Sequence, residues 1–425
     1  MQRRLFLQAA ASSSIFTLGA GMSIATRAAL PEASSITSTN ISNKKLIVVM
    51  LRGAADGLNI VAPIADPNYA RLRPGIGLAK PGQELGALAL DGYFGLHPAL
   101  ADLMPLWQQK KLAFVHGCGS HDATRSHFDA QDYLESGTPG NKSTDDGWMN
   151  RLLAQVPGSR SPTRALAIGP VMPRILSGRA ATSTIASGAA GTRENLLDRP
   201  GIGQAFEQLY KSDAKLAATY ADAKTSHAEI MAAAKQESAF DSKEMKAADM
   251  GAPLPNGFPD DATRLARLMR NEARIQMAFL ALGGWDTHAN QGAGQGQLAN
   301  RLQPLGQGLA RLTRELGPLM KDTLIVVMSE FGRTARQNGN GGTDHGHGNV
   351  MWLLGDTLAG GKVHGAWPGL AEGQLYEGRD LAVSTDFRSV LGQLTQQHFG
   401  LDDKQMRLVF PKHELIKPAG LQLFA

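Results

Sequence analysis

The chain has 425 residues, of which 43% are hydrophobic, with a formal net charge of +5 and a single cysteine, Cys118. One thiol excludes an internal disulfide, so the disulfide-stapled class of small secreted proteins is excluded as well. No block of lysines and arginines is interleaved with aromatics, which argues against a nucleic-acid partner. The length allows a large core in one elaborate α/β domain or in two domains.

The N-terminus has the pattern of a twin-arginine export signal. Arg3 and Arg4 precede an apolar stretch of small residues over 9–25, and the small residues around Ala28 suit a signal peptidase. A membrane-spanning helix is the alternative, but serines and glycines interrupt the continuous run of about 20 apolar residues that a span needs. We therefore expect residues 1–29 to be removed, leaving no transmembrane anchor, and the mature protein to be periplasmic or secreted through the twin-arginine pathway.

The mature chain is expected to form a flexible linker followed by one large domain. Residues 30–44 are rich in Ser, Thr and Asn, which is typical of a tether. Short apolar runs then predict buried strands over 45–51, 112–116, 164–168, 275–282, 324–328 and 350–354. Helical patterns separate them, beginning near 98, 124, 260 and 305, with a last helix over 386–399. This alternation within 45–425 predicts an α/β fold with a mostly parallel sheet and helices on both faces.

One segment departs from the alternation of strands and helices. Residues 204–249 are rich in Ala, Lys, Glu and Gln and contain neither Pro nor Gly. This composition predicts long, mostly exposed helices. We expect a helical insertion at about 170–260, which either caps the sheet edge or binds a partner.

The first two strands are each followed by candidate site residues. Asp56 comes just after the first strand among glycines, where it is either a metal ligand or a turn aspartate. Thr124 and Ser126 lie where a loop after the second strand enters a helix, so their hydroxyls are either helix N-caps or a nucleophile directed at a metal. The positive end of that helix favours an anion, and Arg125 would add a fork for a phosphate-like or sulfate-like group.

Acids and histidines gather again after two later strands. Asp286 and His288 follow the run at 275–282, and Glu330 ends the next strand. A glycine-rich loop then carries the remaining candidate ligands, Asp344, His345 and His347. Carboxylates and imidazoles without thiolates suit a hard-to-borderline metal ion, and the carboxyl ends of parallel strands converge in one crevice. We predict a metal site there with enough groups for two ions; a solvated polar loop is the alternative.

Several motifs together resemble a known family over nearly the whole mature chain. They are the twin-arginine start, LIVVMLRGAADGLN, GLHPAL, ATRSHFDAQDYLESG, GGWDTH, VVMSEFGRT and GGTDHGHGN. The chain resembles the exported family called domain of unknown function 1501, a branch of the alkaline phosphatase and sulfatase superfamily. The resemblance implies a three-layer α/β/α sandwich, one or two divalent metal ions (zinc, calcium, manganese or magnesium) and a Ser or Thr nucleophile at a helix start. It also implies hydrolysis or transfer of phosphate or sulfate esters.

The superfamily pattern can be placed on this chain residue by residue. Asp56 resembles its aspartate after the first strand, Asp286 with His288 its acid–imidazole pair, and Glu330 its later strand-end acid. His345 or His347 resembles its late histidine, and Ser126 is favoured over Thr124 as the nucleophile.

The chain also departs from the pattern at two points. Phe331 stands where the superfamily has a histidine, and the pair Asp286 and His288 is closer in sequence than usual. One metal site is therefore either absent or rebuilt from Asp344 or His127, and Arg333 is a further candidate at the site.

The functional expectation is an exported metal-dependent hydrolase of phosphate or sulfate esters, acting on a small-molecule or glycan ester. Two alternatives stay open. One is a non-catalytic periplasmic binding or assembly protein with a protein partner, which the irregular ligand set favours. The other is a transferase of phosphoryl or sulfo groups in the cell envelope, which would use the same residues.

Overall fold

The computed structural model describes residues 14–17, 23–26, 42–188, 200–234, 247–412 and 421–425. Arg3, Arg4 and most of the expected signal and linker lie outside these residues. The described residues before position 30 form two short strands that pair antiparallel, β1 (Ser14–Thr17) and β2 (Ser23–Thr26). None of the helices in the described part of the chain is long and apolar enough to cross a membrane.

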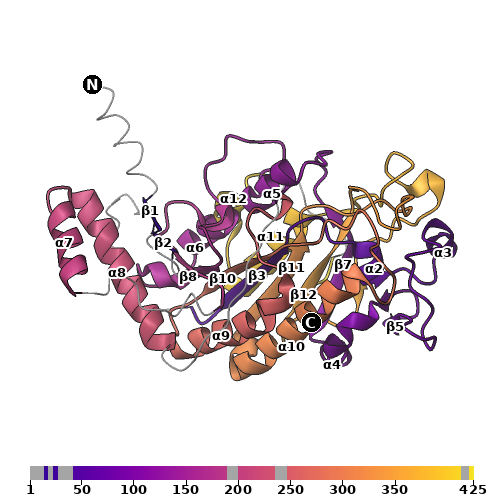
Figure 1. Ribbon diagram of the computed structural model, residues 1–425, viewed down its shortest axis with the longest axis horizontal. Helices are drawn as coiled ribbons and strands as arrows, with labels where there is room; N and C mark the ends of the chain where they lie inside the picture. Colours follow the sequence, from indigo (N-terminus) through magenta and orange to yellow (C-terminus); the bar gives the residue numbers. More distant parts are fainter. Residues whose placement is uncertain (1–13, 18–22, 27–41, 189–199, 235–246, 413–420) are drawn as a thin grey trace.

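The domain is built on a nine-stranded sheet (Figure 1). Its strand order is β13-β7-β12-β11-β3-β10-β8-β9, with β14 also paired to β7. The bounds are β3 (Lys45–Leu51), β7 (Leu112–Gly119), β8 (Ala165–Ile168), β9 (Ser183–Ile185), β10 (Met277–Leu282), β11 (Thr323–Ser329), β12 (Asn349–Leu354), β13 (Val363–His364) and β14 (Thr385–Asp386). Only β12 pairs antiparallel with its neighbours in this sheet, so the expected mostly parallel α/β fold is confirmed.

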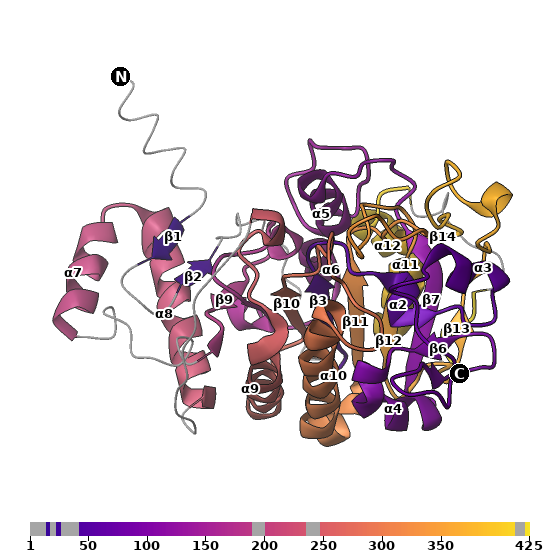
Figure 2. The same ribbon diagram turned by 45° about the vertical axis from the view of Figure 1, so that its right-hand side comes forward.

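Strand β3 shows why the sheet is buried on both faces. All seven of its residues are buried, and its side chains alternate between two hydrophobic cores. Ile47 and Val49 pack in the core under α9 (Phe258–Asn271) and α10 (Gln297–Leu316). Val48 and Met50 pack in the core under α6 (Trp148–Gln155), α11 (Phe387–Phe399) and α12 (Asp403–Val409). The architecture is therefore a three-layer α/β/α sandwich (Figures 1 and 2).

The helices largely follow the expected positions. The leucines along α10 are buried, and the helix expected near 124 is α5 (His127–Ser136). The other α-helices within the described residues are α2 (Gly57–Ile60), α3 (Pro67–Leu72), α4 (Met104–Gln108), α7 (Pro200–Tyr210) and α8 (Ala214–Ala234). The helix expected to be last, α11, is followed by α12, so that expectation was wrong. Asp402 and Gln405 form a capping box that marks the start of α12.

The segment expected to be a helical insertion is only partly helical. It contains α7 and α8, but it also supplies β9, which extends the sheet beyond β8. Figure 2 shows α7 and α8 at the β9 end of the molecule, away from β7 and β13. A separate three-stranded sheet, β4 (Val61–Ala62), β6 (Gly95–Leu96) and β5 (Leu88–Ala89), lies between β3 and β7 in the chain.

Candidate metal centre

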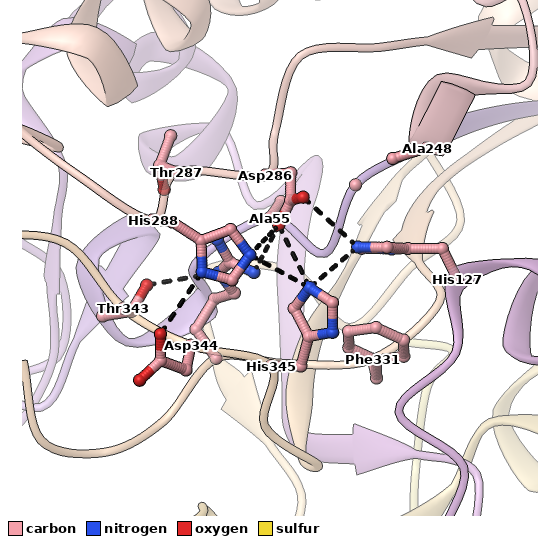
Figure 3. Close-up of polar contacts among 12 residues, drawn as sticks. Ala55, His127, Ala248, Asp286, Thr287, His288, Phe331, Thr343, Asp344 and His345 are labelled. Atoms are coloured by element: carbon pink, nitrogen blue, oxygen red, sulfur yellow. Dashed lines mark hydrogen bonds and ion pairs between the residues drawn. The ribbon is translucent and has the colours of Figure 1, made fainter. Parts of the chain in front are cut away.

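Three segments that are far apart in sequence meet at one edge of the sheet (Figure 3). His127 begins α5 after β7, Asp286 and His288 follow β10, and His345 lies in the loop between β11 and β12. Strands β3, β7, β10 and β11 all run in the same direction, because β12 is antiparallel to both β7 and β11. Their carboxyl ends therefore lie along one edge, which is where ligands bind in sheets of this kind.

Three imidazole rings direct their Nε2 atoms at the Asp286 carboxylate. The Nε2 atom of His345 lies 3.0 Å from Nε2 of His127 and 3.2 Å from Nε2 of His288. Asp286 Oδ1 lies 2.9 Å from Nε2 of His288 and 3.3 Å from Nε2 of His345, and its Oδ2 lies 3.6 Å from Nε2 of His127. Four donor atoms thus converge on one small volume.

The other nitrogen of each ring is held by an oxygen that can only accept a hydrogen bond. His127 Nδ1 lies 2.8 Å from Oε1 of Glu330, and His345 Nδ1 lies 2.9 Å from the carbonyl oxygen of Arg125. His288 Nδ1 lies 3.3 Å from Oδ1 of Asp344. Each Nδ1 must therefore carry the proton, which leaves the Nε2 lone pairs facing the centre. Metal-binding histidines in proteins have this same arrangement of outer partners.

The donor set fits a divalent metal ion. Lone pairs 3.0 Å apart repel one another unless a proton or a cation lies between them, and imidazole with carboxylate is a common zinc ligand set. His127, Asp286 and His345 could hold such an ion, because their ligand atoms all lie within 4.8 Å of one another. His288 offers a fourth donor from the solvent side, where its side chain is 45% exposed.

Without an ion, a proton takes the central position. Burial disfavours the charged form of His127, but hydrogen bonds to Asp286 and Glu330 outweigh it and raise the pKa of His127 to about 9. Burial likewise disfavours charge on Asp286, yet its contacts with His127 and His345 and the charge of Arg333 lower its pKa. The centre therefore favours positive charge between its imidazoles.

Glu330 lies behind His127, although it was expected to be a metal ligand. Its carboxylate is buried and its Oε1 accepts hydrogen bonds from the Gly53 amide at 2.8 Å and from Gln131 Nε2 at 3.0 Å as well as from His127. Burial opposes its ionisation, but the contact with His127 dominates and lowers the pKa of Glu330. The structure thus places Glu330 where it orients and charges the ring of His127.

Arg333 lies against the opposite side of the centre. Its Nη1 donates to Oδ1 of Asp286 at 2.8 Å, and its Nε donates to Oγ1 of Thr343 at 3.2 Å. Its side chain is fully buried, and its Nη2 has no hydrogen-bond partner within the described residues. Arg333 therefore fixes the orientation of Asp286.

Asp56 is not part of the cluster that the imidazoles form. Its Oδ2 accepts hydrogen bonds from Arg73 at 2.5 Å and from Gln291 at 2.6 Å, and both sides of the Arg73 pair are fully buried. Gln291 in turn accepts a hydrogen bond from Thr343, which contacts Arg333. The structure therefore shows Asp56 in a buried ion pair, linked to the centre through these side chains, and its expected role as a metal ligand stays a prediction.

His347 and Asp344 also take positions different from that of His345. His347 stacks on Tyr376 with ring centroids 4.3 Å apart, and burial lowers its pKa. None of the contacts recorded for the described residues joins His347 to the three converging imidazoles. Asp344 supports His288 from outside, and its pKa is lowered by hydrogen bonding to Asn338 and His288. Of the three candidates in this loop, only His345 directs a donor into the cluster.

The hydroxyls of the expected nucleophiles accept hydrogen bonds from backbone amides around the start of α5. The Ser126 hydroxyl accepts from the Asp129 amide, and the Thr124 hydroxyl accepts from the Ser126 amide at 3.2 Å. The guanidinium of Arg125 is paired with Asp380 at 2.8 Å and with Glu377 at 2.6 Å. In the described part of the chain, no recorded contact joins the hydroxyls of Thr124 and Ser126 to the cluster. The structure thus shows Ser126 as the N-cap of α5 and Thr124 in the turn before it, and a nucleophilic role of either hydroxyl stays a prediction.

Two glycines let the loop of His345 approach the strand end closely. The Gly346 amide donates to the Gly332 carbonyl at 2.8 Å, and the Gly332 amide donates to the His347 carbonyl at 2.9 Å. A Cβ atom on either glycine would collide with the opposing backbone. The glycine-rich sequence thus brings His345 beside Asp286.

One supporting residue was missed in the sequence. Gln131 lies four positions after His127, on the same face of α5, and donates to Glu330. Its helical spacing from a histidine is the signal that could have identified it.

Comparisons with known proteins identify the family of the chain and several distantly similar solved structures. The chain belongs to the family described as protein of unknown function (DUF1501), whose model matches residues 43–410. No curated protein matches the chain in sequence. One similar solved structure is a protein in the alkaline phosphatase superfamily from Vibrio parahaemolyticus, with 10% identity over 99% of this chain and 79% of that chain and a TM-score of 0.39.

Two further solved structures are similar at the same low level. The PsFucS1 sulfatase from Pseudoalteromonas sp. has 12% identity over 90% of this chain and 73% of that chain, with a TM-score of 0.37. The zinc complex of the C-terminal periplasmic domain of EcEptC from Escherichia coli has 9% identity over 80% of this chain and 77% of that chain, with a TM-score of 0.35. Such similarity concerns the fold and assigns no role to a residue.

Proposed function

We propose that this DUF1501 protein is an exported, metal-dependent hydrolase of phosphate or sulfate esters. His127, Asp286 and His345 would hold one divalent ion, with His288 as the donor nearest solvent. The single observation that carries the proposal is the convergence of three imidazole Nε2 atoms on one carboxylate while every Nδ1 is held by an acceptor. Zinc is the first choice, because nitrogen donors dominate the set.

The proposal assigns a task to each residue around the centre. A bound divalent ion would polarise the ester oxygen and lower the pKa of a water molecule. Glu330 and the Arg125 carbonyl hold the rings of His127 and His345 in the tautomer that binds. Arg333 holds the Asp286 carboxylate in place. One ion is favoured over two, because Asp56 and Glu330 are committed to other partners.

The attacking group is revised from the sequence expectation. The hydroxyls of Ser126 and Thr124 serve the start of α5, so we assign the attack to water. The water oxygen forms a bond to phosphorus or sulfur, the ester bond breaks, and the departing alcohol oxygen takes up a proton. This reaction releases an alcohol and free phosphate or sulfate.

The location and the substrate are also part of the proposal. The arginine pair and the apolar stretch at the N-terminus support export through the twin-arginine pathway to the periplasm or beyond. A protein exported by this route would meet small-molecule or glycan esters of the cell envelope. Nucleic acid is not proposed as a partner, because no basic block with interleaved aromatics is present in the sequence.

The test compares metal content with turnover in matched variants. The mature protein, purified without chelator, is analysed for metal beside His127→Ala and Asp286→Asn, with His364→Ala on the edge strand β13 as the control. We expect one equivalent of a divalent ion in the wild type and in the control, and none in the two site variants. The proteins that contain the metal ion should hydrolyse 4-nitrophenyl phosphate or 4-nitrophenyl sulfate, and the two site variants should not. Folded wild-type protein that takes up no zinc, manganese, calcium or magnesium would refute the proposal.

A binding protein is the second candidate, and one observation favours it. Four protein donors close a tetrahedral site, whereas catalytic zinc sites keep one position open. Metal in the wild type without turnover of any phosphate or sulfate monoester would support this second function. Replacing the exposed donor by His288→Ala separates the two functions further, because opening a position should increase or preserve turnover only in an enzyme.

A further inference from the structure

A second hollow lies on the same edge of the sheet as the metal centre. Its volume is about 160 Å³, and its walls come from the ends of β8 and β10, the start of α5 and the segments 169–174 and 250–253. Most of its surface is apolar, with Phe128, Met172, Met250 and Phe279 among the lining side chains. An engineered apolar cavity of about 150 Å³ is large enough to bind benzene, so this hollow can take a single ring.

The mouth of this cavity is unusually apolar for a protein surface. Phe128 is 57% exposed, Val171 51% and Met250 44%. These three line the cavity and belong to the eight large hydrophobic side chains that are exposed in the described part of the chain. Such a concentration around a concave site is typical of a ligand-binding surface.

The charges in the cavity wall are already neutralised. Arg52 pairs with Glu135 at 2.5 Å, and Arg174 pairs with Asp132 at 2.7 Å, and all four residues line the cavity. The two positive and two negative charges cancel, so the cavity offers no net attraction to a phosphate or sulfate group. Its chemistry therefore suits a neutral, apolar group.

The cavity is lined by residues that are neighbours in sequence of residues at the metal centre. Phe128 is the next residue after His127 on α5, and Arg52 precedes Gly53, whose amide donates to Glu330. Gln131 Nε2 donates both to Glu330 and to the carbonyl of Ala248, each at 3.0 Å. The segment that carries Ala248 continues to Met250 at the cavity, and Figure 3 shows Ala248 on the His127 side of the cluster.

We infer that this cavity is the subsite for the alcohol portion of the substrate, and that this portion carries a neutral apolar group the size of one aromatic ring. The anionic group would lie at the metal centre and the ring in the cavity, on either side of the start of α5. The inference rests on the proposed function for the link to an ester, but ring binding itself needs neither metal nor turnover.

Gly169 provides a way to fill the cavity. This residue lines it and is buried, and a Cβ atom added there would meet nothing within 4 Å. Gly169→Leu should occupy the space that the ring would take. Gly373→Leu is the matched control, because Gly373 is exposed and also has open space around an added Cβ. Val171→Asp is a second variant, since a charge at the exposed mouth disfavours an apolar ligand without changing the core.

The first measurement is the binding of 4-fluorobenzyl alcohol, which is monitored through the fluorine NMR resonance of the ligand. Wild type and Gly373→Leu should bind it, and Gly169→Leu and Val171→Asp should each weaken binding at least about tenfold, as the loss of apolar pocket contacts does elsewhere. No binding to the wild type, or equal binding to all four proteins, would overturn the inference.

The second measurement connects the cavity to the substrate. KM for phenyl phosphate or phenyl sulfate should rise about tenfold in Gly169→Leu, while KM for the methyl esters stays unchanged. Ring binding without turnover of any ester would refute the proposed hydrolase but leave the cavity as a ring-binding site. If Gly169→Leu changes the turnover of phenyl and methyl esters equally, the subsite is refuted but the proposed hydrolase is not.

Discussion

The Nε2 atoms of His127 and His345 lie 3.0 Å apart, while Nδ1 of each ring donates to an oxygen on its outer side. Two neutral rings held in this way would point lone pairs at each other. The arrangement is stable only when a cation or a shared proton occupies the centre, and the raised pKa of His127 reflects the proton.

Glu330→Gln should weaken metal binding and leave the fold intact. The change removes the negative charge behind His127 but keeps the shape of the side chain, and outer partners of metal ligands are typically worth about 10- to 100-fold in affinity. Competition with a chromophoric zinc chelator measures the affinity, and Glu84→Gln at an exposed position is the control. Equal affinities in both variants would contradict the role assigned to Glu330.

Ser126→Ala should reduce stability rather than turnover. The Ser126 hydroxyl caps α5, and loss of such a cap costs about 1 kcal/mol in the free energy of unfolding. Ser126→Asn is the informative partner, because asparagine caps a helix but cannot replace a seryl nucleophile. We expect Ser126→Asn to keep both stability and turnover, measured by urea unfolding and by ester hydrolysis. An inactive, stable Ser126→Asn protein would restore Ser126 as the nucleophile.

The fold could be predicted from the sequence because its signals are local. The apolar runs at 45–51 and 324–328 lie in β3 and β11, and the leucines after 305 lie on the buried face of α10. The antiparallel direction of β12 left no such signal, since it depends on the path of the glycine-rich loop before it. Helix α12 had a signal in its capping box, but its short apolar pattern was not recognised.

The site could be predicted by residue type more readily than by role. Asp286, His288 and His345 were expected and converge, because strand ends on one edge bring them together. Asp56 lies at the same edge, but Arg73 binds its carboxylate, and that pairing depends on a loop path that a single sequence does not reveal. The roles of His127 and Glu330 could not be predicted for the same reason, since only the three-dimensional arrangement shows that the acid lies behind the ring.

Asp56→Asn should destabilise the protein without removing its metal. Asp56 and Arg73 form a fully buried ion pair, and breaking such a pair by removing one partner costs about 3–5 kcal/mol. Glu207→Gln, which breaks the exposed pair with Lys224, should destabilise the protein far less. Metal analysis at low temperature should still find one equivalent in Asp56→Asn. Loss of metal from a protein that remains folded would instead return Asp56 to the ligand set.

Stability should fall in acid because three histidines are buried in neutral form away from the metal centre. Burial lowers the pKa of His97, His116 and His398 to about 4 in each case, against 6.5 for an exposed ring. The unfolded chain therefore binds more protons than the folded protein between pH 6.5 and pH 4. It follows that the stabilisation is complete above pH 6.5 and is lost as the pH falls towards 4.

His398 offers the cleanest test of this acid sensitivity. Its Nε2 donates to the Lys45 carbonyl at 3.1 Å. The lowering of its pKa from 6.5 to about 4 corresponds to a difference of about 3 kcal/mol in the free energy of unfolding between neutral and acidic solution. His398→Phe should be less stable at pH 7.5, because the mutation removes the hydrogen bond to Lys45. Between pH 4 and pH 6.5 its free energy of unfolding should depend less steeply on pH than that of the wild type, by the slope due to about one bound proton. Urea unfolding at a series of pH values measures both. A slope equal to that of the wild type would show that His398 is already charged in the folded protein, contrary to its buried position.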